Sequence, residues 1–78
     1  MITVYSAPWC GHCQRLKGQL GRAGIPYAEV DVDATPGAIE LITELGGGSW
    51  LIPTVVLPDG SALVNPSIQE IQEAITVR

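Results

Sequence analysis

The sequence contains no phenylalanine and only 5% aromatic residues, so valine, isoleucine and leucine must fill its core. It is also poor in charge: 15% of its 78 residues are charged, and eight acidic against four basic residues give a net charge of −4. Nucleic acids and anionic membranes attract basic surfaces, so this balance argues against both as partners. The 46% of apolar residues predict a folded chain, and its length allows a single domain over residues 1–78.

The N-terminus lacks the basic start and apolar run of a secretory signal, and no segment is apolar over the length of a membrane span. We therefore expect a cytoplasmic protein. In the cytosol lasting disulfides are rare, so two closely spaced cysteines are more often catalytic or metal-binding. Such a pair is present, because Cys10 and Cys13 are the only cysteines and the one histidine, His12, lies between them.

Hydrophobic periodicity and turn residues predict seven elements in the order βαβαββα. The strands are expected at residues 2–5, 27–32, 54–57 and 61–64. The first strand–helix–strand unit predicts a parallel pair joined by a right-handed crossover, and Asp59-Gly60 predicts a hairpin between the last two strands. The expected fold is therefore α/β, a three-layer sandwich with a mixed four-stranded sheet between helices.

Capping residues indicate where two of the helices start. The second helix is expected to begin at Thr35, with Pro36 in its first turn. The third has a capping box of Ser67 and Glu70, although Asn65 followed by a proline offers an alternative start. The apolar stripes expected for the three helices are Cys13, Leu16, Leu20 and Ala23; Ile39, Ile42 and Leu45; and Ile68, Ile71 and Ile75.

Cys10 falls where the first strand ends and the first helix begins, the edge at which α/β folds gather their chemistry. Unpaired N–H groups and the dipole of a helix N-terminus favour a thiolate there. Cys13, one turn along, is placed to attack a mixed disulfide formed by Cys10 and so release the partner. Gly11 keeps the turn uncrowded, and His12, when protonated, can place positive charge near the Cys10 sulfur. These features favour a redox pair.

A structural staple and a metal site are the alternatives. A disulfide across two residues closes a very small loop and so stabilises the fold little. A closed zinc site needs four ligands, whereas the chain offers two cysteines and His12, which would point away from the sulfurs. We predict no metal site, although an iron–sulfur cluster shared between two subunits stays open. The cations Arg15, Lys17 and Arg22 form either a solvated helix face or a positive field beside the cysteines.

A second motif, IPT at residues 52–54, places Pro53 directly before a strand. A cis Ile52–Pro53 bond would turn the chain beside the cysteines, whereas a trans bond would mark a proline that merely begins a strand. The residues alone leave both open. Together, WCGHC, the distant IPT, the later NPS and the order of elements resemble the thioredoxin-like superfamily. Within its glutaredoxin branch the chain looks most similar to the mycoredoxins, small actinobacterial proteins that serve the thiol mycothiol.

The resemblance covers the whole chain and implies an enzyme. It implies a thiol–disulfide oxidoreductase that reduces mixed disulfides between client proteins and a small thiol. Mycothiol, or alternatively glutathione, would be the thiol co-substrate, and no cofactor would be bound. A reductase would be a further partner if the oxidised protein is recharged by another enzyme. We expect a monomer.

By position, the resemblance makes Cys10 the nucleophile and Cys13 the resolving thiol of a redox-active disulfide. Pro53 becomes a cis-proline, and the backbone of Ile52 before it would pair with the thiol of the substrate. Trp9, Gly11 and His12 would lie around the sulfur and contact the substrate.

Other positions follow from the resemblance less directly. Trp50 is either a second aromatic flank or a loop side chain, and Lys17 matches a lysine common in glutaredoxins but is equally compatible with a solvated side chain. The sugar end of mycothiol would bind the backbone amides from Asn65 to Ser67, on a helix start, or the loop of residues 46–49.

Two positions depart from the glutaredoxin pattern. Members that use glutathione usually carry a cation three residues before the nucleophile, where it holds the glycine carboxylate of glutathione. Here Ala7 stands at that position, and mycothiol has no such carboxylate. His12 replaces the usual tyrosine, and a histidine that stabilises the reduced thiolate makes the couple more oxidising.

Two other functions are alternatives. An NrdH-like electron donor for protein disulfides, recharged by thioredoxin reductase, would have a similar length. Those proteins carry a W-S-G-F-R-P-type stretch near the C-terminus, where this chain reads SALVNPSIQEI. An iron–sulfur cluster carrier that holds the cluster through Cys10 belongs to a different class, and iron content would distinguish it.

Overall fold

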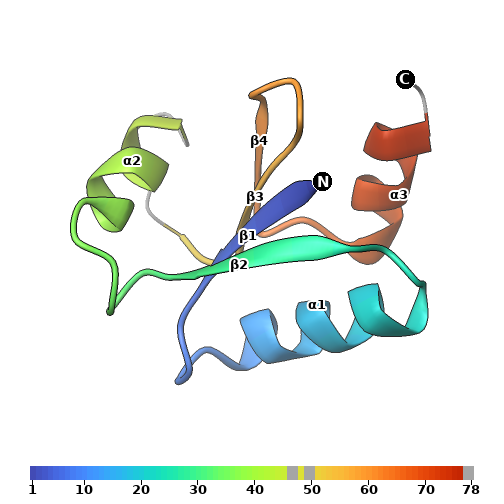
Figure 1. The fold of residues 1–78 in the computed structure, drawn as a ribbon, viewed down its shortest axis with the longest axis horizontal. Coiled ribbons are helices and arrows are strands. Elements are labelled where there is room, and N and C mark those ends of the chain that lie inside the picture. Colours follow the sequence, from blue (N-terminus) through green and yellow to red (C-terminus); the bar gives the residue numbers. More distant parts are fainter. Residues whose placement is uncertain (46–47, 49–50, 77–78) are drawn as a thin grey trace.

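The computed structural model describes residues 1–45, 48 and 51–76, and its elements follow the predicted order βαβαββα (Figure 1). Within these residues the elements are β1 (Ile2–Ser6), α1 (Gly11–Arg22), β2 (Tyr27–Asp31), α2 (Ala38–Leu45), β3 (Thr54–Val56), β4 (Ala62–Val64) and α3 (Ile68–Thr76). None of these helices is long and apolar enough to cross a membrane.

The described strands form one mixed sheet in the order β2-β1-β3-β4. β1 and β2 run parallel, with Ser6 opposite Asp31, whereas β1 pairs with β3, and β3 with β4, in antiparallel fashion. β1 is therefore central, and the short turn after it leads directly into α1. The mixed four-stranded sheet expected from the sequence is confirmed.

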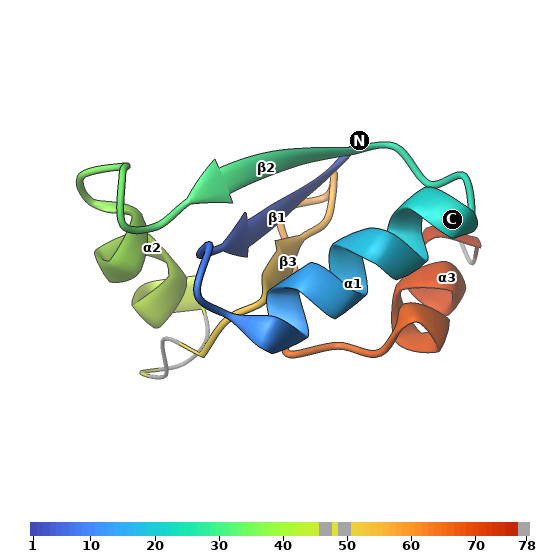
Figure 2. The ribbon, with the colours of Figure 1, turned by 90° about the horizontal axis from the view of Figure 1, so that it is seen from below.

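Alternation along the strands divides the apolar core between the two faces of the sheet. On one face, Val4 packs with Leu20 of α1 and Ile71 of α3. On the other face, Tyr5 packs with a cluster that includes Ile42 of α2. The ribbon shows the same division: α3 lies beside α1, while α2 stands apart at the opposite end of the molecule (Figure 1, Figure 2). The predicted three-layer α/β architecture is thus confirmed.

The start of α2 differs from the prediction. Gly37 has φ +83°, in the left-handed region, so residues before Ala38 form a turn, which the Ala38 N–H closes by donating to the Thr35 carbonyl at 3.2 Å. Because the helix begins at Ala38, Ala38 and Ile42 face the core, one turn apart. Of the expected stripe, only Ile42 is buried, and Ile39 and Leu45 are exposed.

The other two helices follow their predictions more closely. α1 buries Cys13, Leu16 and Leu20, although Ala23, also expected inside, is exposed and caps the helix end. α3 begins with the predicted capping box: the Ser67 N–H donates to Glu70 Oε1 at 2.9 Å, and the Glu70 N–H donates to Ser67 Oγ at 3.1 Å. The alternative start at Asn65 is therefore wrong.

Candidate active site

Cys10 caps the N-terminus of α1. Its backbone is extended, with φ −91° and ψ 110°, and its Sγ accepts a hydrogen bond from the backbone N–H of Cys13 at 3.3 Å. The Cys10 N–H donates to the carbonyl of Ala7 at 3.1 Å, which fixes the turn between β1 and α1. An N–H aimed at a sulfur from a helix start favours negative charge on it. The helix start expected at this cysteine is confirmed.

Cys13 lies one turn further, on the inner side of α1, and is 0% exposed. Burial raises the pKa of its thiol to about 12, and a hydrogen bond with Cys10 acts in the same direction. Cys13 is therefore protonated near neutral pH. Both cysteines are free thiols in this structure. Both side chains are buried, Cys10 at 7% and Cys13 at 0% exposed, so the two sulfurs differ in their contacts rather than in burial alone. The Cys10 sulfur accepts an N–H at a helix start, whereas the pKa of the Cys13 thiol is raised.

The Ile52–Pro53 peptide bond is cis, the first of the two alternatives that the residues left open. Cys10 Sγ lies 3.9 Å from the carbonyl oxygen of Ile52, although 42 positions separate the two residues. The loop after β4 joins the same place, because the Asn65 N–H donates to the Pro53 carbonyl at 2.7 Å. Asn65 has φ +49°, a left-handed conformation that asparagine tolerates better than most residues. Segments from α1, β3 and the β4–α3 loop therefore meet around Cys10.

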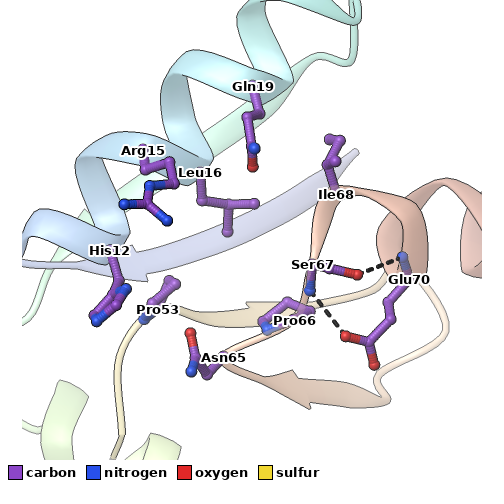
Figure 3. Close-up of a pocket in the computed structure, with 10 residues that line it drawn as sticks. All are labelled: His12, Arg15, Leu16, Gln19, Pro53, Asn65, Pro66, Ser67, Ile68 and Glu70. Carbon is purple, nitrogen blue, oxygen red and sulfur yellow. Dashed lines mark hydrogen bonds between the residues drawn. The ribbon is translucent and has the colours of Figure 1, made fainter.

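A groove of about 310 Å³ runs from this meeting point between α1 and the start of α3 (Figure 3). Its walls are formed by His12, Arg15, Leu16 and Gln19 of α1, Pro53, and Asn65, Pro66, Ser67, Ile68 and Glu70. Neither cysteine lines it, but its near end is formed by His12 and Pro53, which flank the Cys10 region. In the described chain the side chains of Arg15 and Gln19 have no hydrogen-bond partner, so both are available to a ligand.

Trp9 and Gly11, the neighbours of Cys10, have different surroundings. Trp9 is 65% exposed, and its Nε1–H donates to Asp33 Oδ2 at 2.6 Å, which ties the indole to the segment after β2. A Cβ placed on Gly11 would meet nothing within 4 Å. The expectation that Gly11 relieves crowding is therefore wrong. Trp50 and, except for Gly48, the loop of residues 46–49 lie outside the described residues.

Sequence reasoning missed a charged cluster on the inner side of α1. Lys17, left open as a solvated side chain, forms an ion pair with Glu29 of β2 at 2.6 Å. The buried Ser6 hydroxyl donates to the same carboxylate at 2.8 Å. The hydrogen bond from Lys17, and then that from Ser6, holds the pKa of Glu29 below its usual range. The four-residue spacing from Cys13 to Lys17 indicates a shared helix face, but the pairing with Glu29 also requires that α1 lie over β2.

The position of Ala7 bears on the choice of ligand. Ala7 is 1% exposed and packs against Cys10 and Cys13 rather than facing the groove. A longer cationic side chain at this position would therefore have to displace that packing. As for metals, no three His, Cys, Asp or Glu side chains come together as ligands within residues 1–45, 48 and 51–76.

The fold and the site define a thioredoxin-like protein with a C-x-x-C pair at the start of its first helix. The solved glutaredoxin from Archaeoglobus fulgidus superposes with a TM-score of 0.79 at 25% identity, over 95% of this chain and 84% of that one. The sequence profile of the glutaredoxin family matches residues 2–61. The chain therefore belongs to the glutaredoxin family, whose members are generally thiol–disulfide oxidoreductases.

Two relatives are similar to the chain over most of its length. A glutaredoxin-like protein of Mycobacterium tuberculosis is 42% identical over 71 residues, which are 91% of this chain and 84% of the relative. Mycoredoxin 1 of Corynebacterium glutamicum is 33% identical over 70 residues, which are 90% of this chain and 86% of that one. Both alignments cover most of both proteins, so the similarity is not confined to one part of the chain.

Proposed function

We propose that this protein removes a small thiol from protein mixed disulfides, with Cys10 as the nucleophile. The Cys10 thiolate attacks the sulfur of the small thiol, and the client cysteine leaves as a thiolate and takes up a proton. Cys10 is then disulfide-bonded to the small thiol. A second small-thiol molecule, as thiolate, attacks that bond, so that the oxidised small thiol leaves and the Cys10 thiolate returns. The two electrons that reduce the client come from two small-thiol molecules.

One observation carries this proposal: the Cys10 sulfur lies between a helix N–H donor and the Ile52 carbonyl, and the neighbouring residues His12 and Pro53 line an open groove. The N–H stabilises the charge that leaves and returns to the sulfur during exchange. The groove offers space for the rest of a small thiol next to the reacting atom. In this proposal, Trp9 and His12 flank the bound thiol, and the Ile52 backbone pairs with it.

We infer that the small thiol is mycothiol. Ala7 carries no charge, and Arg15 and Glu70 bring one charge of each sign to the groove, so it has little net attraction for the carboxylates of glutathione. Gln19, Asn65 and Ser67 carry amide and hydroxyl groups, which both donate and accept and so suit a neutral, hydroxyl-rich sugar. The similarity to Mycoredoxin 1 supports the same choice.

Cys13 adds a second route. Its sulfur lies next to Cys10, so it can attack a mixed disulfide that Cys10 forms with a protein and release that protein reduced. An internal disulfide is then left, which a thiol or a reductase must reduce. Removal of a small thiol can finish without Cys13, whereas reduction of a protein disulfide needs it.

A second candidate is an NrdH-like electron donor recharged by thioredoxin reductase. The observation that favours it is the pair of exposed apolar side chains Trp9 and Leu51, each next to a residue that contacts the Cys10 sulfur or contains it. Exposed apolar side chains at a reactive group suit contact with a protein surface. The groove, which a purely protein-directed donor does not need, places this candidate second.

The test is turnover of one protein mixed disulfide with three electron sources: mycothiol, glutathione, and thioredoxin reductase with NADPH. We expect the highest kcat/KM with mycothiol. Equal or better turnover with glutathione would show the mycothiol assignment to be wrong, and turnover with the reductase alone would favour the second candidate. An Ala7→Lys variant is a poor probe of this choice, because the residue is buried and the lysine would disturb the packing.

A further inference from the structure

One turn along α1 from Cys13, a charged cluster joins three elements that are far apart in the sequence. Lys17 Nζ of α1 and Glu29 Oε2 of β2 are 2.6 Å apart, and Ser6 Oγ, at the end of β1, donates to the same oxygen at 2.8 Å. The Lys17 side chain is 17% exposed and that of Glu29 is 42% exposed. The Lys17 side chain is thus mostly covered, whereas the contact between its ammonium and Glu29 is exposed to solvent.

This cluster acts on the resolving thiol. Lys17 lies four residues after Cys13 and hence on the same face of α1. Burial is the main cause that raises the pKa of the Cys13 thiol, and Cys10 raises it further. The Lys17 ammonium acts in the opposite direction and lowers this pKa. Glu29 acts through Lys17, because it holds the ammonium in place and offsets its charge.

Among residues 1–45, 48 and 51–76, the rest of the cluster packed around Cys13 contributes no further charge. The packed cluster around it consists otherwise of Ala7, Val32, Ala38 and Ile42, with Tyr5, Val30 and Ile52 at its edge. Asp31, the other acid on this face of β2, accepts a hydrogen bond from the Asp33 backbone at 2.9 Å. His12 faces the groove instead (Figure 3).

We propose that the Lys17–Glu29 pair sets how fast Cys13 attacks a mixed disulfide at Cys10. In this step the Cys13 thiol loses its proton, its sulfur bonds to Cys10 Sγ, and the bond between Cys10 and the partner breaks. The partner leaves as a thiolate and takes up a proton, so it is reduced while Cys13 is oxidised. Lys17 stabilises the thiolate that must form and Glu29 moderates that effect, so both are positioning residues.

The consequence, which rests on the proposed function, is a division between two routes. If Cys13 attacks fast, every mixed disulfide at Cys10 is converted to the internal disulfide between Cys10 and Cys13. A slow attack leaves the bond between Cys10 and the small thiol intact until a second small-thiol molecule takes over. Glu29 offsets the charge of Lys17 and so slows the attack by Cys13. It thereby favours the second route, in which a small thiol completes the reaction.

The test uses dithiobis(nitrobenzoate), which releases a coloured thiolate at each of two steps. Attack by Cys10 releases the first and leaves a mixed disulfide, and attack by Cys13 releases the second. Stopped-flow measurement on the full chain with one equivalent of reagent, repeated over pH, gives both rates. Because the reagent contains neither mycothiol nor a client protein, the result can be interpreted even if the proposed function is wrong.

Lys17→Met should slow the second step and Glu29→Gln should accelerate it, each by about threefold. This figure follows because a tenfold change in thiolate fraction is partly offset by the nucleophilicity of the thiolate, with a Brønsted coefficient of about 0.5. Lys17→Arg, which keeps the charge, should restore the second rate. Arg22→Gln removes a cation from the end of the same helix and should change neither rate.

Opposite shifts are the decisive feature, since a loss of packing would slow the second step in both variants. If Lys17→Met and Glu29→Gln move the second rate in the same direction, or neither moves it more than Arg22→Gln does, the proposal is overturned. The first rate, which reports attack by Cys10, should stay within twofold of the unsubstituted chain in all four variants.

Discussion

The side of helix α1 that faces α3 differs from the side that faces the sheet. On the side facing α3 lies an open groove in which Arg15 and Gln19 have no hydrogen-bond partner within the described chain (Figure 3). On the side facing the sheet, Cys13 is enclosed, and Lys17 is paired with Glu29. Unpaired polar groups at a surface cost little and can bind a ligand, whereas polar groups near a core must satisfy one another. We therefore assign thiol binding to the groove side of α1 and control of the Cys13 sulfur to the sheet side.

The largest effect is expected when the Cys10 sulfur is removed. We expect Cys10→Ser to abolish turnover, because Cys13 is enclosed and its pKa of about 12 leaves it protonated. Iodoacetamide at neutral pH should label Cys10 first in the reduced chain, as peptide mass spectrometry would show. Labelling of Cys13 ahead of Cys10 would reverse the assignment, and alkylation in denaturant, where both react, is the control.

Cys13→Ser tests whether the enclosed sulfur serves only one of the two routes. We expect it to keep removal of a small thiol from a protein within about threefold of the unsubstituted rate. Reduction of an intramolecular protein disulfide should be lost, because nothing inside the chain then releases the client. Both activities are measured on the same preparation, with the small thiol in excess. Equal loss of both activities would contradict the division between the two routes.

On the groove side, the expected effect is smaller. Gln19→Ala removes one amide from the groove, and one neutral hydrogen bond contributes about 0.5–1.5 kcal/mol. We therefore expect KM for mycothiol to rise by about two- to tenfold, with kcat little changed. Gln72→Ala removes the same side chain from an exposed position of α3 outside the groove and is the matched control. An unchanged KM in Gln19→Ala would exclude this glutamine from thiol binding.

Local rules predicted much of this molecule. The order of elements along the chain, the helix start at Cys10 and the capping box of Ser67 and Glu70 rest on residue spacing and capping preferences, and all are confirmed. The start of α2 was missed because Thr35 and Pro36 are also good turn residues. The left-handed Gly37 that follows decides for a turn, and the dipeptide Pro36-Gly37 is a local turn signal that the predicted helix start did not take into account.

The parts of the site that depend on contacts between distant residues could not be predicted as well from the sequence. The sequence could not choose between cis and trans at Pro53, because the answer depends on packing between the end of β1 and the start of β3. The ion pair of Lys17 and Glu29 was missed for a similar reason. It requires that α1 lie over β2, and this placement follows from the fold rather than from either residue.

The smallest expected effect concerns the acid stability of the inner side. The folded-state pKa of Glu29 lies below its unfolded value of about 4.3, since Lys17 and Ser6 both bind its carboxylate. The resulting stabilisation is fully present above the unfolded pKa and is lost as pH falls through the lowered folded value. Glu29→Gln should therefore lose less stability than the unsubstituted chain between about pH 5 and pH 2.

The measurement is Tm by circular dichroism at a series of pH values. The Glu29 side chain is 42% exposed, so the difference should stay within the about 1 kcal/mol typical of ion pairs open to solvent. Glu73→Gln is the matched control, because Glu73 is exposed and has no ion-pair partner among residues 1–45, 48 and 51–76. Identical dependence of Tm on pH in the two variants would show that Lys17 and Ser6 do not hold Glu29 in solution. The inner side of α1 would then be as open as the groove, and the contrast between the two sides would disappear.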